Sequence, residues 1–171
     1  MAPALFLSHG APLLAIEDSA ARRYLTEMGG HIRQPRAIVI MSAHHHAQNA
    51  PNRVEVVTDP GPATVHDFGG FPDALYAITY PASGAPDLGT EICEQLTEAG
   101  FDAAANPDRG FDHGIWVPLM LMYPQADVPV VQIAINMAED PHWHFRVGAA
   151  LAPLRESNVL IVGSGSATHN L

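Results

Sequence analysis

The stretch AIVIMS, residues 37–42, is apolar almost throughout and is followed after one residue by three histidines that begin at His44. An unbroken apolar run is typical of a parallel strand that is covered on both faces. A second apolar run, residues 3–7, ends in a Ser-His-Gly motif that contains His9. Because the loops after parallel strands converge on one edge of an open sheet, the pattern predicts an α/β fold with histidines gathered at that edge.

Strand-like and helical patterns alternate along the whole chain. We expect strands at 3–7, 36–42, 54–58, near Phe101, 128–135 and 159–162, and helices at about 18–28, 73–78, 87–99, 114–122 and 141–155. This order predicts an α/β fold with a mostly parallel central sheet and helices on both faces. The chain shows no shift in composition, so we expect residues 1–171 to form a single domain. The last strand ends too close to Leu171 to be followed by a covering helix, so we expect the domain to lack a C-terminal portion.

The composition narrows the possible partners. The 171 residues are 47% hydrophobic and carry a net charge of -10 with only eight Lys and Arg, which argues against nucleic acid and anionic membranes. The apolar start of the chain lacks a basic region, so it fits neither a signal peptide nor a spanning helix. The lone cysteine, Cys93, can form no internal disulfide, which suits a cytoplasmic protein. The sequence does not define an oligomeric state, and a homo-oligomer stays open.

Histidines follow three of the expected strands, and this placement predicts a metal site. They are His9, His44 and His169, the last of which follows a Gly-Ser-Gly-Ser run. Neutral imidazole is the commonest metal ligand in proteins, and a catalytic site uses two or three protein ligands with open positions for substrate. Alternate residues of an extended segment point to opposite faces, so we expect His44 to face the site and His45 and His46 to line it or meet solvent.

The remaining histidines divide into one functional candidate and several surface residues. Asp112 can cap a helix that begins near Gly114, which places His113 at the helix N-terminus. A helix N-terminus favours neutral imidazole, the state that a proton-shuttling group needs near neutral pH. The alternative is that Asp112 and His113 only cap the helix. The histidines expected on the surface are His31, His142 and His144.

Five motifs in the same order resemble a known family. They are SHGAP at 8–12, SAH at 42–44, HDFGGFP at 66–72, DHG at 112–114 with WVPL at 116–119, and GSG at 163–165 through HNL at 169–171. The chain resembles the 4,5-DOPA extradiol dioxygenase type of the class III aromatic ring-opening dioxygenases, which is similar to the catalytic subunit of protocatechuate 4,5-dioxygenase. The resemblance runs from Ala4 to the last residue.

The resemblance implies a single non-haem metal, Fe(II) for activity and Zn(II) in some isolated members. By motif, His9 and His44 correspond to metal ligands. His169 corresponds to a ligand in zinc-bound DOPA-type members and to the catalytic base in protocatechuate-type enzymes, and His113 to an acid or oxygen-pocket residue. Two departures stand out. His45 replaces the aromatic residue usual after the SAH motif, and the family takes a further His or Glu ligand from a C-terminal portion that this chain does not contain.

The resemblance implies a catalytic domain that opens the aromatic ring of a DOPA-like or related catechol with O2 to give a muconic semialdehyde. Its partners would then be the small-molecule catechol and O2. Two other classes remain open from the residues alone. The same histidines could hold Zn(II) and activate water in a hydrolase, or the scaffold could serve as a non-catalytic, Memo-type interaction protein. Activity with Fe(II) would favour the dioxygenase, and activity with Zn(II) would favour the hydrolase. Turnover of any catechol would exclude the non-catalytic interaction protein.

Overall fold

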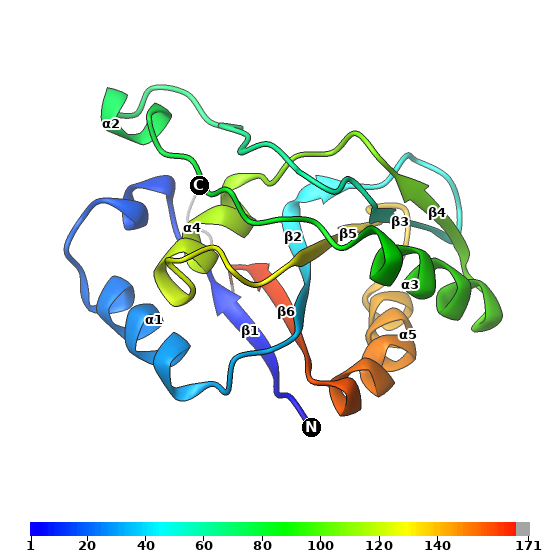
Figure 1. Cartoon of the computed structure of the whole chain (residues 1–171). Coiled ribbons are helices and arrows are strands. Elements are labelled where there is room, and N and C mark those ends of the chain that lie inside the picture. The colour runs from blue at the N-terminus through cyan, green and yellow to red at the C-terminus, as the bar shows by residue number, and fades with distance from the viewer. Residues whose placement is uncertain (167–171) are drawn as a thin grey trace.

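A computed structural model describes residues 1–166 and shows one six-stranded sheet flanked by helices (Figure 1). The strand order is β1-β6-β2-β5-β3-β4. The strands are β1 (Ala4–Ser8), β2 (Ala37–His46), β3 (Arg53–Val57), β4 (Asp102–Asn106), β5 (Val130–Ile135) and β6 (Val159–Gly165). The helices are α1 (Ala20–His31), α2 (Asp73–Tyr76), α3 (Pro86–Glu98), α4 (His113–Met122) and α5 (Pro141–Leu151), with 3₁₀ turns at Pro12–Ala15 and Ala152–Ser157.

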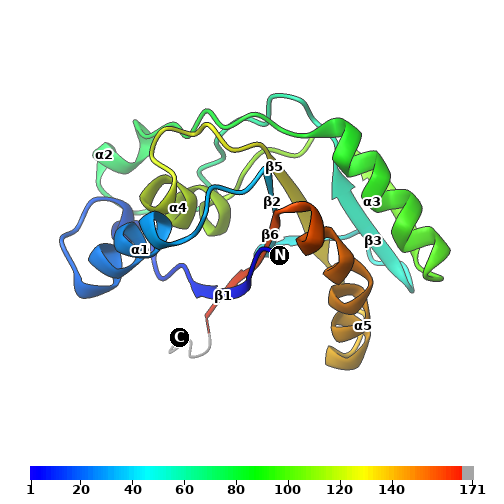
Figure 2. The same ribbon diagram turned by 60° about the horizontal axis from the view of Figure 1, so that its bottom comes forward.

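The sheet is mostly parallel, as the sequence predicts. The pairs β1–β6, β6–β2, β2–β5 and β3–β4 run parallel, and only β3 and β5 pair antiparallel, at Val56 and Ile133. In Figure 2, α1 and α4 lie on one side of the sheet and α3 and α5 on the other. The prediction of helices on both faces is therefore confirmed. In the described part of the chain, no helix is long and apolar enough to cross a membrane.

Each sheet face has its own apolar core. On the α1–α4 face, Ile38 and Ile40 of β2 pack with Trp116 and Leu119 of α4. On the α3–α5 face, Val39 belongs to a second cluster that includes side chains of α3 and α5. Neighbouring residues of β2 thus serve opposite cores, which explains why this strand has no polar residue before Ser42.

Side-chain caps start α1 and α5 close to the residues at which the sequence predicts these helices to begin. The Ser19 side chain accepts a hydrogen bond from Arg22 N at the start of α1, and Asp140 accepts one from Trp143 N at the start of α5. Helix α1, however, continues past its expected end near residue 28, through Gly29 and Gly30, and ends at His31. Gly29 is buried against the Met122 backbone, where a Cβ atom would clash, so this glycine permits helix packing and does not end the helix.

Candidate metal centre

Three histidines from three separate elements meet at the carboxyl edge of the sheet. His9 follows β1, His44 lies near the end of β2, and His113 is the first residue of α4. Each offers one ring nitrogen, and these three atoms all lie within 4.8 Å of one another. His9 Nε2 and His44 Nε2 are 3.0 Å apart. The predicted convergence of His9 and His44 is confirmed, whereas His169 lies outside the described residues.

Hydrogen bonds on the outer side of two rings fix which nitrogen faces the centre. Ser164 Oγ donates its hydrogen to Gly114 O and accepts one from His9 Nδ1 at 2.9 Å. His113 Nδ1 donates to Asp67 Oδ1, also at 2.9 Å, because an ionised carboxylate can only accept. Both imidazoles therefore carry their hydrogen on Nδ1 and keep a lone pair on Nε2. An outer hydrogen bond of this kind is the usual way in which proteins orient a metal-binding histidine.

Burial favours the neutral form of two imidazoles of this cluster, those of His9 and His44. Burial, and after it the charges of His113 and His44, lowers the pKa of His9 to about 4. The pKa of His44 is also lowered, first by burial and then by His113. Metal ions bind the unprotonated ring, so both side chains are ready to act as ligands at neutral pH.

The spacing of the nitrogens fits a divalent transition metal. When no metal is bound, a neutral His44 with its hydrogen on Nε2 can donate it to the Nε2 lone pair of His9, 3.0 Å away. A bound cation would replace that hydrogen and accept both lone pairs. Two nitrogens that each lie roughly 2.0–2.1 Å from one ion, at an angle between a right angle and the tetrahedral value, are roughly 3 Å apart. The residues present therefore fit a metal such as Fe(II) or Zn(II), with the histidine donors that both accept.

Asp112 forms hydrogen bonds to residues next to two of these histidines. It is fully buried and accepts hydrogen bonds from Ser42 Oγ at 2.5 Å, from Gly114 N and Gln132 Nε2 at 3.0 Å, and from Arg109 Nη2 at 3.3 Å. Ser42 Oγ in turn accepts from the backbone N of His44 at 3.1 Å. The predicted helix cap is confirmed, and the same carboxylate ties the start of α4 to the strands β2 and β5.

The structure changes the expectations for the other histidines. His45 does not face solvent: it is only 3% exposed, and its Nε2 lies 4.0 Å from Glu55 Oε2. The physical reason is a register shift between Met41 and His46, which extends β2 beyond the predicted end at Ser42. His46 is exposed, as are His31 and His142. His144 is only partly exposed, because it bonds to Asp140 O and Asn136 N.

Two findings at the centre were not predicted from the sequence. The first is that His113 lies close enough to His9 and His44 to share a metal with them. The second is the part played by Asp67, which bonds to His113 across 46 positions of the chain. Its only sequence signal was its place in the HDFGGFP motif, within a stretch rich in Gly and Pro that shows no periodicity.

The comparisons with known proteins agree with this arrangement. The family model of the catalytic LigB subunit of aromatic ring-opening dioxygenase matches residues 3–171, and the chain belongs to this family. It is 44% identical over 168 residues to the 4,5-DOPA dioxygenase extradiol of Beta vulgaris, covering 96% of this chain and 61% of the relative. It is 42% identical over 170 residues to the 4,5-DOPA dioxygenase extradiol of Escherichia coli (strain K12), covering 99% of this chain and 60% of the relative.

A solved structure shares the fold. The crystal structure of an uncharacterized protein from Escherichia coli K12 superposes with a TM-score of 0.80 at 35% sequence identity, covering 99% of this chain and 62% of that chain. The chain thus spans about three fifths of the length of the relatives that it matches. The family and the fold are shared over this length.

Proposed function

We propose that the protein is a non-haem, metal-dependent extradiol dioxygenase that opens the ring of a DOPA-like catechol with O2 to give a muconic semialdehyde. The observation that carries the proposal is the convergence of His9, His44 and His113, with ring nitrogens within 4.8 Å, in a chain of the LigB family. The names of the relatives from Beta vulgaris and Escherichia coli support a DOPA-like substrate. The lone Cys93 supports a cytoplasmic location.

In this proposal His9 and His44 hold the metal, Fe(II) in the active form and Zn(II) as an alternative occupant, and His169 provides a further ligand. When bound, the metal brings the ionised catechol and O2 together at one centre. Neutral imidazoles suit this task, since they leave the metal its positive charge. The burial that lowers the pKa of His9 and of His44 supports their role as ligands.

We assign proton transfer to His113, and to His169 when it reaches the substrate. His113 is 7% exposed and carries a free Nε2 on the inner side of its ring. From there Nε2 can accept a proton from a catechol hydroxyl and later return it to an oxygen of the product. The hydrogen bond to Asp67 keeps Nδ1–H on the outer side, so the same nitrogen serves in both directions.

The test is anaerobic loading with Fe(II), followed by oxygen uptake and absorbance measurements with a panel of catechols. We expect oxygen consumption and a yellow semialdehyde with DOPA or caffeate. Zn(II)-loaded protein is the matched control and should consume no oxygen. Oxygen uptake with none of the catechols, or ester hydrolysis that depends on Zn(II), would contradict the proposal.

Metal analysis of variants tests the assignment of residues. His9→Ala and His44→Ala should each abolish most metal binding. His113→Ala should keep its metal and lose on the order of a hundredfold or more in turnover, the usual scale for a lost acid–base group. His169→Ala should weaken metal binding in part and abolish most turnover. Full metal loss in His113→Ala would instead assign this residue as a ligand.

A further inference from the structure

Asp67 forms hydrogen bonds to His113 and also faces His44. Its Oδ1 atom accepts hydrogen bonds from His113 N at 3.0 Å and from His113 Nδ1 at 2.9 Å. Its Oδ2 atom lies 3.9 Å from His44 Nδ1. The carboxylate therefore lies on the outer side of both rings, opposite the nitrogens that face the centre.

The segment that carries Asp67 is fixed in place by backbone contacts. Thr64 forms a β-bridge with Phe111, and Val65 N donates to Phe111 O at 2.8 Å. Trp116 Nε1 donates to Val65 O at 3.1 Å, which ties the segment to α4. Asp67 is thus held beside the first turn of the helix whose first residue is His113, and its side chain is only 21% exposed.

The charge on Asp67 is maintained by its partners. Burial raises the pKa of this carboxyl, but hydrogen bonds from the side chain and backbone of His113 outweigh burial and lower the pKa to about 2. An ionised carboxylate has no hydrogen to donate, so His113 must place its own hydrogen on Nδ1. Without such an acceptor a neutral imidazole favours the hydrogen on its Nε2 atom. That form would turn a donor, instead of a lone pair, toward the centre.

We propose that Asp67 is a positioning residue that holds His113 with its hydrogen on Nδ1 and presents the Nε2 lone pair of His113 to the substrate. Its second oxygen lies 3.9 Å from His44 Nδ1, beyond hydrogen-bond distance, so it acts on that ring only through its charge. The proposal rests on the proposed function for its consequence in turnover, but the orientation of the ring is independent of the reaction. Carboxylate partners of histidines at metal centres typically change metal affinity or activity by roughly 10–100-fold when removed.

A merely structural role for Asp67 makes a different prediction. Because Oδ1 also accepts from the backbone N of His113, the carboxylate could serve only to secure the start of α4. In that case its removal would lower stability and leave the tautomer of His113 unchanged. The position of the imidazole hydrogen therefore separates the two roles.

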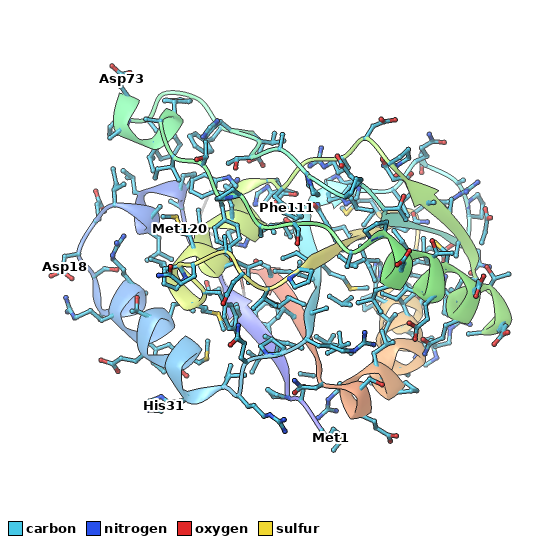
Figure 3. The ribbon with its side chains drawn as sticks, viewed as in Figure 1. Met1, Asp18, His31, Asp73, Phe111 and Met120 are labelled. Atoms are coloured by element: carbon cyan, nitrogen blue, oxygen red, sulfur yellow. The ribbon has the colours of Figure 1, made fainter. Side chains whose placement is uncertain are left out.

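The experiment compares Asp67→Ala, Asp67→Asn and the control Asp73→Asn in the full chain. Asp73 is an exposed acid in the first turn of α2 and projects from the periphery of the molecule (Figure 3), so its replacement makes the same change in charge away from the centre. Proteins labelled with ¹⁵N-histidine are examined by NMR before and after addition of Zn(II). The His113 signals are assigned by their loss in His113→Gln. Zn(II) affinity is measured by competition with a chromophoric chelator.

We expect the wild-type protein and Asp73→Asn to show the Nδ1–H form of His113 before Zn(II) is added. Asp67→Asn should keep this form, because an amide oxygen can accept the same two hydrogen bonds. Asp67→Ala should shift His113 toward the Nε2–H form and, like His113→Ala, keep its Zn(II), because His9 and His44 hold the metal. In Fe(II)-loaded protein its kcat should fall by roughly 10–100-fold with little change in KM.

The proposal is overturned by an Nε2–H form in the wild-type protein, or by an unchanged His113 tautomer in a folded Asp67→Ala. The wild-type measurement decides even where Asp67→Ala does not fold. Loss of catechol turnover in every protein, wild type included, would refute the proposed function and leave the tautomer result standing for Asp67. The two failures are therefore distinguishable.

Discussion

Replacement of the buried Asp112 by alanine should be among the most destabilising single changes in the chain. The substitution removes the acceptor of Ser42 Oγ, Gly114 N and Gln132 Nε2, which are bonded to it at 2.5–3.0 Å. Each buried donor left without a partner costs roughly 1–3 kcal/mol. Arg109, whose side chain is 30% exposed, can turn to water and adds little.

The three donors together would cost roughly 3–9 kcal/mol if nothing relaxed. The Ser42 hydroxyl can rotate to another acceptor, so we expect a loss near the lower end, about 3–5 kcal/mol, the range found when one partner of a buried charged network is removed. Asp112→Asn should cost less, because its oxygen can still accept from Ser42 and Gly114. The free Oε1 of Gln132 can then accept from the new amide after Gln132 rotates its own amide group.

Urea unfolding followed by tryptophan fluorescence and circular dichroism measures these losses, with the free energy of unfolding taken by linear extrapolation. Asp108→Ala is the matched control, since Asp108 is exposed and should change stability by less than about 0.5 kcal/mol. A loss below about 1 kcal/mol in Asp112→Ala would refute the reasoning, because it would mean that the three donors find other partners. Equal losses in Asp112→Ala and Asp112→Asn would also refute it, since only the former removes both acceptor oxygens.

Two further predictions concern the same edge of the sheet. Gly114→Ala places a Cβ atom against Ser42 Oγ and 3.2 Å from His44 Cδ2, so the Zn(II) affinity should fall by about tenfold or more. Gly148→Ala is the control: nothing lies within 4 Å of its new Cβ atom, so the Zn(II) affinity should stay unchanged. Burial, and then Arg109, lower the pKa of His45 to about 4. In the unfolded chain His45 binds a proton near pH 6.5, whereas in the folded chain it does so only near pH 4. The contribution of His45 to the free energy of unfolding is therefore complete above pH 6.5 and falls by roughly 2–3 kcal/mol as the pH is lowered toward 4. Urea unfolding at several pH values should show this decline in the free energy of unfolding, and the decline should be smaller in His45→Phe. An equal decline in His45→Phe would show that other groups cause it.

The architecture could be predicted because its signals are local. The apolar run at 37–42, the cap at Ser19 and the Asp140-Pro141 pair each specify an element within a few residues. The parallel order then follows from the alternation of strands and helices. The end of β2 could not be predicted in this way. Its extension to His46 depends on a register shift and on pairing of His46 with Ile135 of β5, a contact between distant parts of the chain.

The centre itself was predictable only in part, for a related reason. His9 and His44 could be found because each comes at the end of a buried strand, and parallel topology brings such ends together. His113 was expected beside the site but not within reach of a shared metal, because the distance from a helix start to a strand end depends on how α4 packs. Asp67 lies in a segment without periodicity, so its position is fixed by contacts with Phe111 and Trp116 that no local pattern shows.

The groups that orient the rings come from different elements than the rings, so the centre depends on register as well as on residue identity. His9 follows β1, but its partner Ser164 lies on β6, where it pairs with Leu7. A slip of one residue between these strands would turn Ser164 to the opposite face of the sheet and leave His9 Nδ1 without its acceptor. Ser164 also bonds to Gly114 O at the start of α4, so the same hydroxyl fixes both a ligand and the helix that carries His113. The geometry of the metal centre therefore depends on the correct assembly of β1, β6 and α4. A variant that shifts the register of β1 and β6 should lose metal binding before it loses secondary structure.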